Sequence, residues 1–186
     1  MKSSFIILIF GLPGSGKTTL SRGLSQEIKV PLLTTEYIRS RLFNEICVKG
    51  DKDFSKKELD ITYNTILVCA EYLVASGSAV IVDGVYRFQS QREQIKNLAN
   101  KVGIKFFPIF LHCLDEVIID RLIAKKKIDS IAPAGVETFK RIKRQYEYPS
   151  DKHIPIDTSN ITAKELTTMV LDLLFSKKND KIRRTL

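Results

Sequence analysis

The glycine-rich stretch that follows the first apolar run constrains the fold of this chain more than any other feature. Residues 5–10 read Phe-Ile-Ile-Leu-Ile-Phe, and residues 11–18 read Gly-Leu-Pro-Gly-Ser-Gly-Lys-Thr. A continuous apolar run of this kind is typical of a strand buried on both faces of a parallel sheet. The residues that follow have helical spacing, so the glycines occupy a junction between a strand and a helix. Backbone N–H groups at such a junction can surround an anion.

This stretch fits the P-loop pattern G-x-x-x-x-G-K-S/T, which binds the phosphates of nucleoside triphosphates. Its glycines let the backbone approach the phosphates, and the following helix adds its positive N-terminal end. Lys17 is expected to contact the β- and γ-phosphates, and the Thr18 hydroxyl to bind Mg²⁺. The nucleotide-binding residues expected here are Gly11, Pro13, Gly14, Ser15, Gly16, Lys17, Thr18 and Thr19.

An export signal is the alternative interpretation of the N-terminus, because Lys2 precedes a short apolar run. The run ends at Gly11, no A-x-A-like cleavage site follows, and Lys17 comes soon afterwards. No stretch approaches the roughly 18 apolar residues of a membrane span. The three cysteines show no C-x-x-C spacing, which argues against a zinc site or a disulfide framework. We therefore expect a cytoplasmic protein with reduced thiols and no membrane partner.

Strand-like and helix-like segments alternate along the rest of the chain, which predicts an α/β fold in three layers. The expected strands span residues 5–10, 30–34, 79–83, 104–112 and 154–157. The expected helices span residues 17–28, 37–46, 56–76, 90–102, 115–126, 136–146 and 162–175, with capping boxes at Ser90–Glu93 and Thr162–Glu165. No linker divides the chain, so we expect one domain over residues 1–176 and a basic tail over residues 177–186.

The P-loop alone does not decide what happens to the terminal phosphate. A GTPase needs N-K-x-D and D-x-x-G stretches, and the chain contains neither. A motor ATPase carries a second acid that activates water, but the strand that ends in Asp83 is followed by Gly84. A kinase needs a carboxylate for the acceptor, basic groups around the phosphoryl group and a cover that excludes water. The ends of the later strands carry suitable side chains.

Three further stretches resemble those of small P-loop kinases, a family that includes gluconate, adenylylsulfate, chloramphenicol and polynucleotide 5′-hydroxyl kinases. They are residues 32–42, residues 80–86 followed by Arg92, and residues 111–122. The resemblance extends over residues 5 to about 175. It implies a P-loop NTPase fold like that of adenylate kinase. The expected features are a five-stranded parallel sheet in the order 2-3-1-4-5, helices on both faces, and a short lid at about residues 125–135.

The same resemblance implies roles for residues on the acceptor side. Glu36 stands where the family has Asp and would orient the acceptor hydroxyl, unless it is only an acid favoured by the helix dipole. Arg39 would hold the acceptor, or would be a solvated helix arginine. Asp83 ends an apolar strand, where a buried acid needs a partner such as Mg²⁺ or Lys17.

Arg92 lies on the inward stripe of its expected helix, and relatives carry an arginine there that contacts the acceptor. The alternative is an arginine that snorkels past the edge of the core. Tyr86, together with Arg87, is expected to line the acceptor pocket. These residues complete the expected substrate contacts, which are Glu36, Arg39, Asp83, Tyr86 and Arg92.

Arg121 matches the arginine that in relatives contacts ATP phosphates or stacks on adenine. Four residues on, relatives often carry a second arginine, whereas this chain has Lys125, which lacks the bidentate fork of arginine. Asp157 and Ser159 belong to a loop similar to the one that flanks adenine. We therefore expect catalysis by Lys17, Glu36 and Arg121, and further nucleotide contacts from Arg121, Lys125, Asp157 and Ser159.

These features predict an ATP- and Mg²⁺-dependent kinase whose acceptor is a hydroxyl of a metabolite, sugar, nucleoside or antibiotic. The net charge of +9 leaves a polynucleotide 5′ end as an alternative acceptor. No basic platform interleaved with aromatic residues supports that alternative. A non-catalytic regulatory nucleotide-binding module is a further alternative, because Glu36 replaces the family's Asp. The sequence leaves the oligomeric state open, between monomer and dimer.

Overall fold

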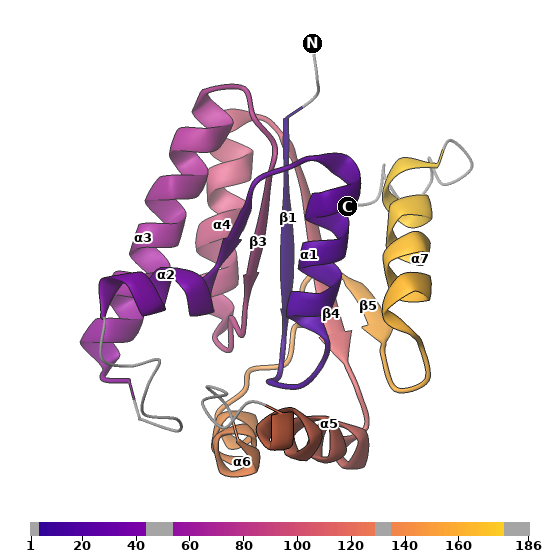
Figure 1. The fold of residues 1–186 in the computed structure, drawn as a ribbon. Helices are drawn as coiled ribbons and strands as arrows, with labels where there is room; N and C mark the ends of the chain where they lie inside the picture. Colours follow the sequence, from indigo (N-terminus) through magenta and orange to yellow (C-terminus); the bar gives the residue numbers. More distant parts are fainter. Residues whose placement is uncertain (1–3, 44–53, 129–134, 177–186) are drawn as a thin grey trace.

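The computed structural model describes residues 4–43, 54–128 and 135–176, and it contains a five-stranded parallel sheet (Figure 1). The strand order is β2-β3-β1-β4-β5, which confirms the expected fold. All four strand pairings are parallel. The strands are β1 (Phe5–Gly11), β2 (Leu32–Thr34), β3 (Val80–Gly84), β4 (Lys105–His112) and β5 (Ile154–Asp157).

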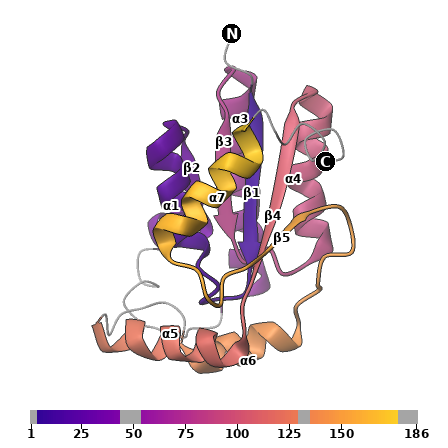
Figure 2. The same cartoon turned by 90° about the vertical axis from the view of Figure 1, so that its right-hand side faces the viewer.

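Alternate residues of β1 face two separate apolar cores, one on each side of the sheet. Ile6 and Leu8 belong to the core beneath α3 and α4, whereas Ile7 and Ile9 belong to the core beneath α1 and α7. All four side chains are fully buried, as expected for the central strand of a parallel sheet. The helices on the two faces, seen in Figures 1 and 2, are α1 (Lys17–Ile28), α3 (Lys56–Ala75), α4 (Gln89–Val102) and α7 (Ala163–Phe175).

Three further helices surround the carboxyl ends of the strands. They are α2 (Thr35–Leu42), α5 (Asp115–Ile128) and α6 (Val136–Arg144). Both views place α5 and α6 beyond this end of the sheet (Figures 1 and 2). The Lys143 ammonium of α6 donates to the Asp115 carboxylate at the start of α5. This end of the sheet is where open α/β folds bind their ligands.

The capping boxes show where local sequence signals succeed and fail. The Thr162–Glu165 box is confirmed, because the Glu165 N–H donates to the Thr162 hydroxyl and the Thr162 N–H donates to the Glu165 carboxylate. The expected box at Ser90 is wrong. Helix α4 begins at Gln89, and the backbone N–H of Phe88 donates to Oε1 of Gln91 over 3.2 Å.

Several expected segments lie wholly or partly outside the described residues. The expected helix over residues 37–46 begins at Thr35, and its last residues fall within 44–53, which are not described. The same holds for residues 129–134 of the expected lid and for the basic tail over 177–186. The division into one domain and a tail therefore stays a prediction. Within the described ranges, no helix is both long and apolar enough to cross a membrane.

Candidate functional site

The P-loop has the backbone geometry that its glycines predict. Gly16 is the residue before α1 and has a φ of +89°, a left-handed conformation that glycine adopts without strain. At Gly11, an added Cβ would lie 2.2 Å from the carbonyl oxygen of Leu111, so only glycine lets β1 lie this close to β4. The turn between Gly11 and Gly16 leads directly into α1. The first N–H groups of α1 have no partner within the helix. N–H groups arranged in this way can bind an anion.

Lys17 is buried at the start of α1, and its Nζ donates to the carbonyl oxygen of Leu12 over 2.8 Å. Burial lowers the pKa of Lys17 from 10.5 to about 8, because a charged ammonium loses its hydration there. The negative charges of Asp83 and Glu36 partly oppose this shift. The lysine therefore lies within electrostatic reach of both carboxylates.

Asp83, at the end of β3, is buried and forms the centre of a polar cluster. The Ser21 hydroxyl donates to its Oδ2 over 3.1 Å, and the Thr18 hydroxyl also hydrogen-bonds to it. Burial raises the pKa of Asp83, while Lys17 and the two hydroxyls oppose the rise. Ser21 is a member of this cluster that sequence reasoning missed.

The cluster suits Mg²⁺, which takes oxygen ligands and usually binds through few protein groups, waters and substrate phosphates. Thr18 provides a hydroxyl beside the buried carboxylate of Asp83, so the two residues expected at the metal do lie together. The described residues contain no group of three or more His, Cys, Asp or Glu that could hold a metal by itself. A metal here would therefore depend on the phosphates of a bound nucleotide.

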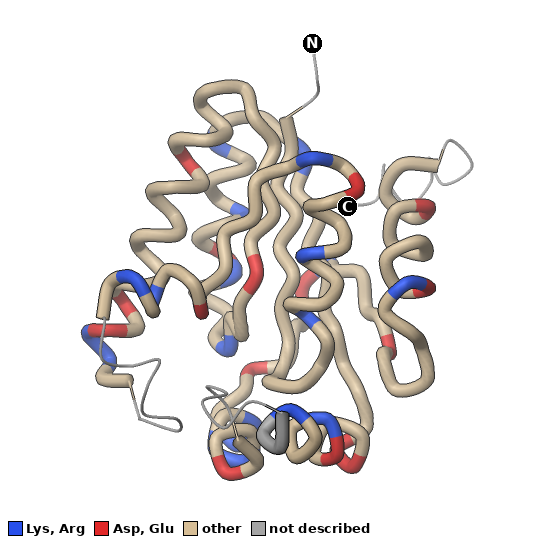
Figure 3. The backbone as a smooth tube through the Cα atoms, viewed as in Figure 1, with Lys and Arg blue, Asp and Glu red and all other residues tan. Residues whose placement is uncertain are grey.

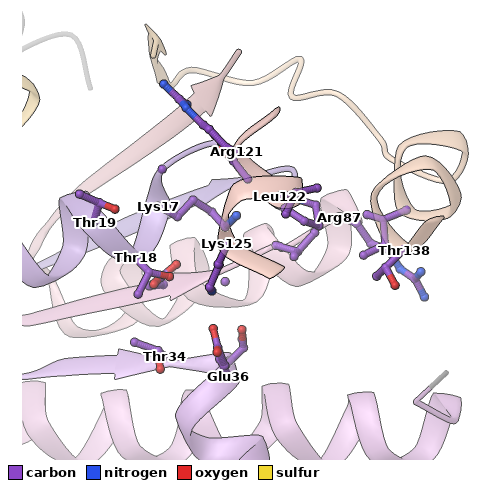
Figure 4. Close-up of a pocket in the computed structure, with 18 of the residues that line it drawn as sticks. Lys17, Thr18, Thr19, Thr34, Glu36, Arg87, Arg121, Leu122, Lys125 and Thr138 are labelled. Carbon is purple, nitrogen blue, oxygen red and sulfur yellow. The ribbon is translucent and has the colours of Figure 1, made fainter. Parts of the chain in front are cut away.

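A cavity of about 730 Å³ opens over the P-loop (Figure 4). Its wall includes Pro13, Gly14, Gly16, Lys17, Thr18 and Thr19, whereas Gly11 and Ser15 are buried behind it. On the β3 side, the wall comes from α2, α3, the loop after β3, and α6. On the β5 side, it comes from α5, the loop after β5, and α7. The cavity thus extends to both sides of the P-loop.

Glu36 and Arg39 both line the β3 side of this cavity. The Thr34 hydroxyl accepts a hydrogen bond from the N–H of Tyr37 over 3.1 Å and so fixes the first turn of α2. Figure 4 shows the Glu36 carboxylate directed toward Lys125 and Thr18. A carboxylate in this position can hold a hydroxyl group next to the phosphate site.

Arg121 lines the cavity as expected, but its guanidinium is turned toward the loop after β5. Its side chain points away from Lys17 in Figure 4. Nη2 donates to the Thr158 carbonyl over 2.6 Å, and Nη1 lies 3.5 Å from the Gly14 carbonyl. Arg121 therefore links the P-loop to the loop after β5. Lys125 lines the cavity as well, close enough to Lys17 to lower the pKa of Lys17 further.

Among the described residues, Asp157 and Ser159 do not line the cavity as expected, because they bond to each other. The hydroxyl and backbone N–H of Ser159 donate to Asp157 Oδ1 over 2.6 and 2.8 Å, and these bonds lower the pKa of Asp157. The residue between them, Thr158, is buried and does line the cavity. In the sequence, Thr158 is indicated only by its place between Asp157 and Ser159.

Tyr86 and Arg92 require a correction, because both are buried and neither lines the cavity among the described residues. The Tyr86 ring packs edge-on against Tyr63, with ring centroids 4.9 Å apart. Nη1 of Arg92 donates to the Tyr86 carbonyl over 2.8 Å, and the guanidinium lies 5.4 Å from the Phe10 ring centroid. Arg92 does point inward as predicted, but the loop after β3 folds between it and the cavity.

Sequence reasoning missed most of the acceptor-side wall. Tyr63 comes from the middle of α3, and Arg141 and Gln145 come from the end of α6 and the residue after it. Arg87 had been expected only alongside Tyr86, yet it is Arg87 that lines the cavity. The basic run around Arg141 is visible in the sequence, but the direction in which its side chains point depends on how α6 packs.

The family model AAA_33, described as "AAA domain", matches residues 6–149 of this chain. The chain is 26% identical over 183 residues to a sulfate adenylyltransferase of Phaeosphaeria nodorum, a match that covers 95% of this chain and 30% of that protein. It is 27% identical over 168 residues to an adenylyl-sulfate kinase of Synechococcus sp., with coverage of 90% and 92%.

A solved structure of an APS kinase from Mycobacterium tuberculosis, in complex with AMPPNP and APS, has a TM-score of 0.68 to this chain. The sequence identity is 20%, and the match covers 94% of this chain and 99% of that one. At this identity the likeness establishes the fold.

Proposed function

Because this chain belongs to the AAA_33 family, we propose that it is a kinase that transfers the γ-phosphoryl group of ATP to a hydroxyl group of a small molecule. The observation that carries the proposal is the position of Glu36. This carboxylate lies on a separate helix and faces the P-loop across the cavity. A protein that only hydrolysed or sensed ATP would not need an acceptor-side wall.

On the nucleotide side, the N-terminal N–H groups of α1 and the ammonium of Lys17 bind the β- and γ-phosphates. Lys17 must exchange the Leu12 carbonyl for phosphate oxygens, and the gain in charge pairing favours that exchange. Thr18 and Asp83 would hold Mg²⁺, which neutralises charge on the phosphates when it is bound. Together these groups offset the negative charge that repels an incoming alcohol.

On the acceptor side, Glu36 accepts a hydrogen bond from the hydroxyl group. It takes the hydroxyl proton as the new P–O bond forms and the bond between the γ-phosphorus and the β–γ bridging oxygen breaks, which releases ADP. Glu36 is exposed, so its carboxylate can reach a substrate without a buried-charge penalty. Positioning and electrostatic stabilisation account for most of the rate enhancement in phosphoryl transfer, because the protein forms no covalent bond to the phosphoryl group.

Relatives named adenylyl-sulfate kinase match over nearly their full length, and this supports phosphoryl transfer to a small molecule. The chain also matches part of a longer sulfate adenylyltransferase, of which it spans 30%. The names of these relatives do not identify the acceptor of this chain, since the sequence identities are only 26% and 27%.

The direct test is a phosphotransfer screen with purified protein, Mg²⁺ and ATP labelled at the γ-phosphate. The acceptor panel contains sugars, sugar acids, nucleosides, nucleotides, aminoglycosides and oligonucleotide 5′ ends. We expect label to appear in one small-molecule class and to be lost in Lys17→Ala, which should keep its fold by circular dichroism. Label that appears only in oligonucleotides, or only as free phosphate, would overturn the proposal.

A further inference from the structure

We propose that Glu147 is a positioning residue for the acceptor side of the cavity, because it ties the loop after β3 and the start of α4 to the end of α6. This inference rests on the proposed kinase function, which makes this side the acceptor side. The loop after β3 lines the cavity through Arg87, and α6 lines it through Thr138 and Ile142. Figure 3 shows the segment that follows α6 passing close to the loop after β3.

Helix α4 begins without a capping group of its own. Its N-cap residue is Phe88, whose phenyl ring offers no hydrogen-bond acceptor, and its first turn contains no acidic residue. The N–H of Gln89, the first residue of the helix, instead donates to Oε2 of Glu147 over 2.6 Å. A carboxylate at this end of a helix satisfies a free N–H group and pairs with the positive end of the helix dipole. Glu147 therefore caps α4 from 58 residues away in the sequence.

The segment around Glu147 makes three further contacts with the loop after β3. The N–H of Glu147 donates to the carbonyl oxygen of Arg87 over 2.9 Å. Oε1 of Gln145 accepts a hydrogen bond from Nη1 of Arg87 over 2.9 Å, and the Tyr146 hydroxyl donates to the carbonyl oxygen of Val85 over 3.4 Å. Because this segment follows α6 directly, its contacts join the loop to α6.

The start of α4 also decides the direction of the loop after β3. Nη1 of Arg92, one turn into α4, donates to the carbonyl oxygen of Tyr86 over 2.8 Å. Tyr86 has a φ of +43°, a conformation that a tyrosine keeps only where its surroundings hold it. A shift at the start of α4 would move Arg92 and release Tyr86, and the next residue, Arg87, would lose its place in the cavity wall. Glu147 thus acts on this wall through α4 as well as directly.

The chain allows a test that leaves the core intact, because Glu147 is exposed. Glu147→Ala removes the acceptor of the Gln89 N–H, whereas Glu147→Gln loses the charge but keeps an acceptor oxygen. Glu137 supplies the matched control. It is exposed in the first turn of α6, and its carboxylate pairs with Lys140 over 3.1 Å rather than with the loop after β3.

The first experiment measures amide hydrogen exchange in the free proteins, so it needs neither nucleotide nor acceptor. We expect the amides of residues 85–91 to exchange about 2- to 30-fold faster in Glu147→Ala than in the wild type, the factor that loss of a helix cap implies. Glu147→Gln should fall between the two, and Glu137→Ala should match the wild type. Unchanged exchange over residues 85–91 in Glu147→Ala would overturn the inference. Faster exchange that extends equally to β1 and α1 would also overturn it, because Glu147 would then serve overall stability.

The second experiment separates this inference from the proposed function. AMP-PNP affinity is measured by calorimetry, and KM is measured for ATP and for the small molecule that takes the label in the phosphotransfer screen. We expect Glu147→Ala to raise KM for that molecule about fivefold or more, and Glu147→Gln to recover most of the loss. AMP-PNP affinity and KM for ATP should stay within about twofold. Absence of AMP-PNP binding in every protein would refute the kinase proposal and leave the exchange result to decide on Glu147. Normal AMP-PNP binding with an unchanged KM for the acceptor would refute only the positioning role.

Discussion

The hydroxyl of Thr158 lies 3.1 Å from the carbonyl oxygen of Ser15 and donates a hydrogen bond to it, although 143 residues separate the two in sequence. The His112 carbonyl lies 3.2 Å from the same hydroxyl, and Nη1 of Arg121 donates to it, also over 3.2 Å. This buried threonine therefore connects the P-loop, the end of β4 and α5 at one point. It holds the loop that binds phosphate in register with the β5 side of the cavity.

Replacement of Thr158 by valine should weaken nucleotide binding more than acceptor binding. The variant keeps the side-chain shape but leaves two buried carbonyls and an arginine without the hydroxyl. We expect the free energy of unfolding to fall by about 1–3 kcal/mol and KM for ATP to rise severalfold. Thr65→Val on α3, where the hydroxyl bonds only to the Ile61 carbonyl over 2.8 Å, is the control. An unchanged KM for ATP in a Thr158→Val protein that has lost stability would limit Thr158 to a folding role.

Replacement of Glu36 by glutamine should slow phosphoryl transfer without affecting ATP affinity. Glutamine can still hydrogen-bond to a hydroxyl but cannot accept its proton, so kcat should fall by about 100-fold or more. ATP affinity, measured by calorimetry, should stay within about twofold, because Glu36 does not belong to the P-loop. Glu27→Gln, an exposed substitution on α1, provides the control. If turnover by Glu36→Gln matched that of the control, another group would have to orient the acceptor.

Burial lowers the pKa of Lys17 to about 8. Binding of Mg²⁺-ATP should therefore weaken above about pH 8. Below this pH the ammonium is already charged, so nucleotide binding takes up no proton. Above it the free protein holds a neutral lysine and must gain a proton to bind, so affinity falls by up to about tenfold per pH unit. Calorimetry in buffers of different ionisation enthalpy should detect uptake of close to one proton at about pH 9.

Lys17→Arg supplies the comparison for this titration, because arginine stays charged throughout the range. Its affinity will be lower, since the longer fork does not fit the lysine position, but it should show no proton uptake on the alkaline side. An affinity in the wild type that stays flat between about pH 7 and pH 9.5 would show that the lysine is charged in the free protein.

Replacement of Arg92 by methionine should destabilise the loop after β3 without removing a contact to the acceptor. Arg92 supports the carbonyl of Tyr86, a residue with a φ of +43° that depends on its surroundings. We expect the free energy of unfolding to drop by about 1–3 kcal/mol. The exposed Arg22→Met on α1 should change it little. If Arg92→Met instead raised KM for the acceptor at least about tenfold and kept full stability, Arg92 would have to reach the acceptor after all.

The phosphate half of the site could be predicted almost residue by residue. Gly16, Lys17 and Thr18 are consecutive, so their relative positions depend only on the local turn between β1 and α1. Asp83 could be predicted as well, because a charged residue at the end of a fully apolar strand must find a partner. The strand order followed from the family resemblance and was confirmed in the structure.

The acceptor half could not be predicted in the same way, because its residues are brought together by packing. Arg92 has the inward position that suggested a substrate contact, yet the loop of Tyr86 and Arg87 covers it and presents Arg87 instead. Arg141 resembles any surface arginine of a basic helix until α6 is placed against the end of the sheet. Helical spacing identifies the inner face of an element, but it does not say whether that face meets the core or a cavity.

The sequence by itself determined that this chain forms a P-loop at the end of a buried parallel strand. It could do so because the required turn, the helix start and the lysine are encoded within eight adjacent residues. Only the tertiary structure decided which arginines line the cavity, that Arg121 is tied to Thr158, and that Glu36 faces the P-loop. These positions depend on contacts between elements far apart in the chain, which no local pattern specifies.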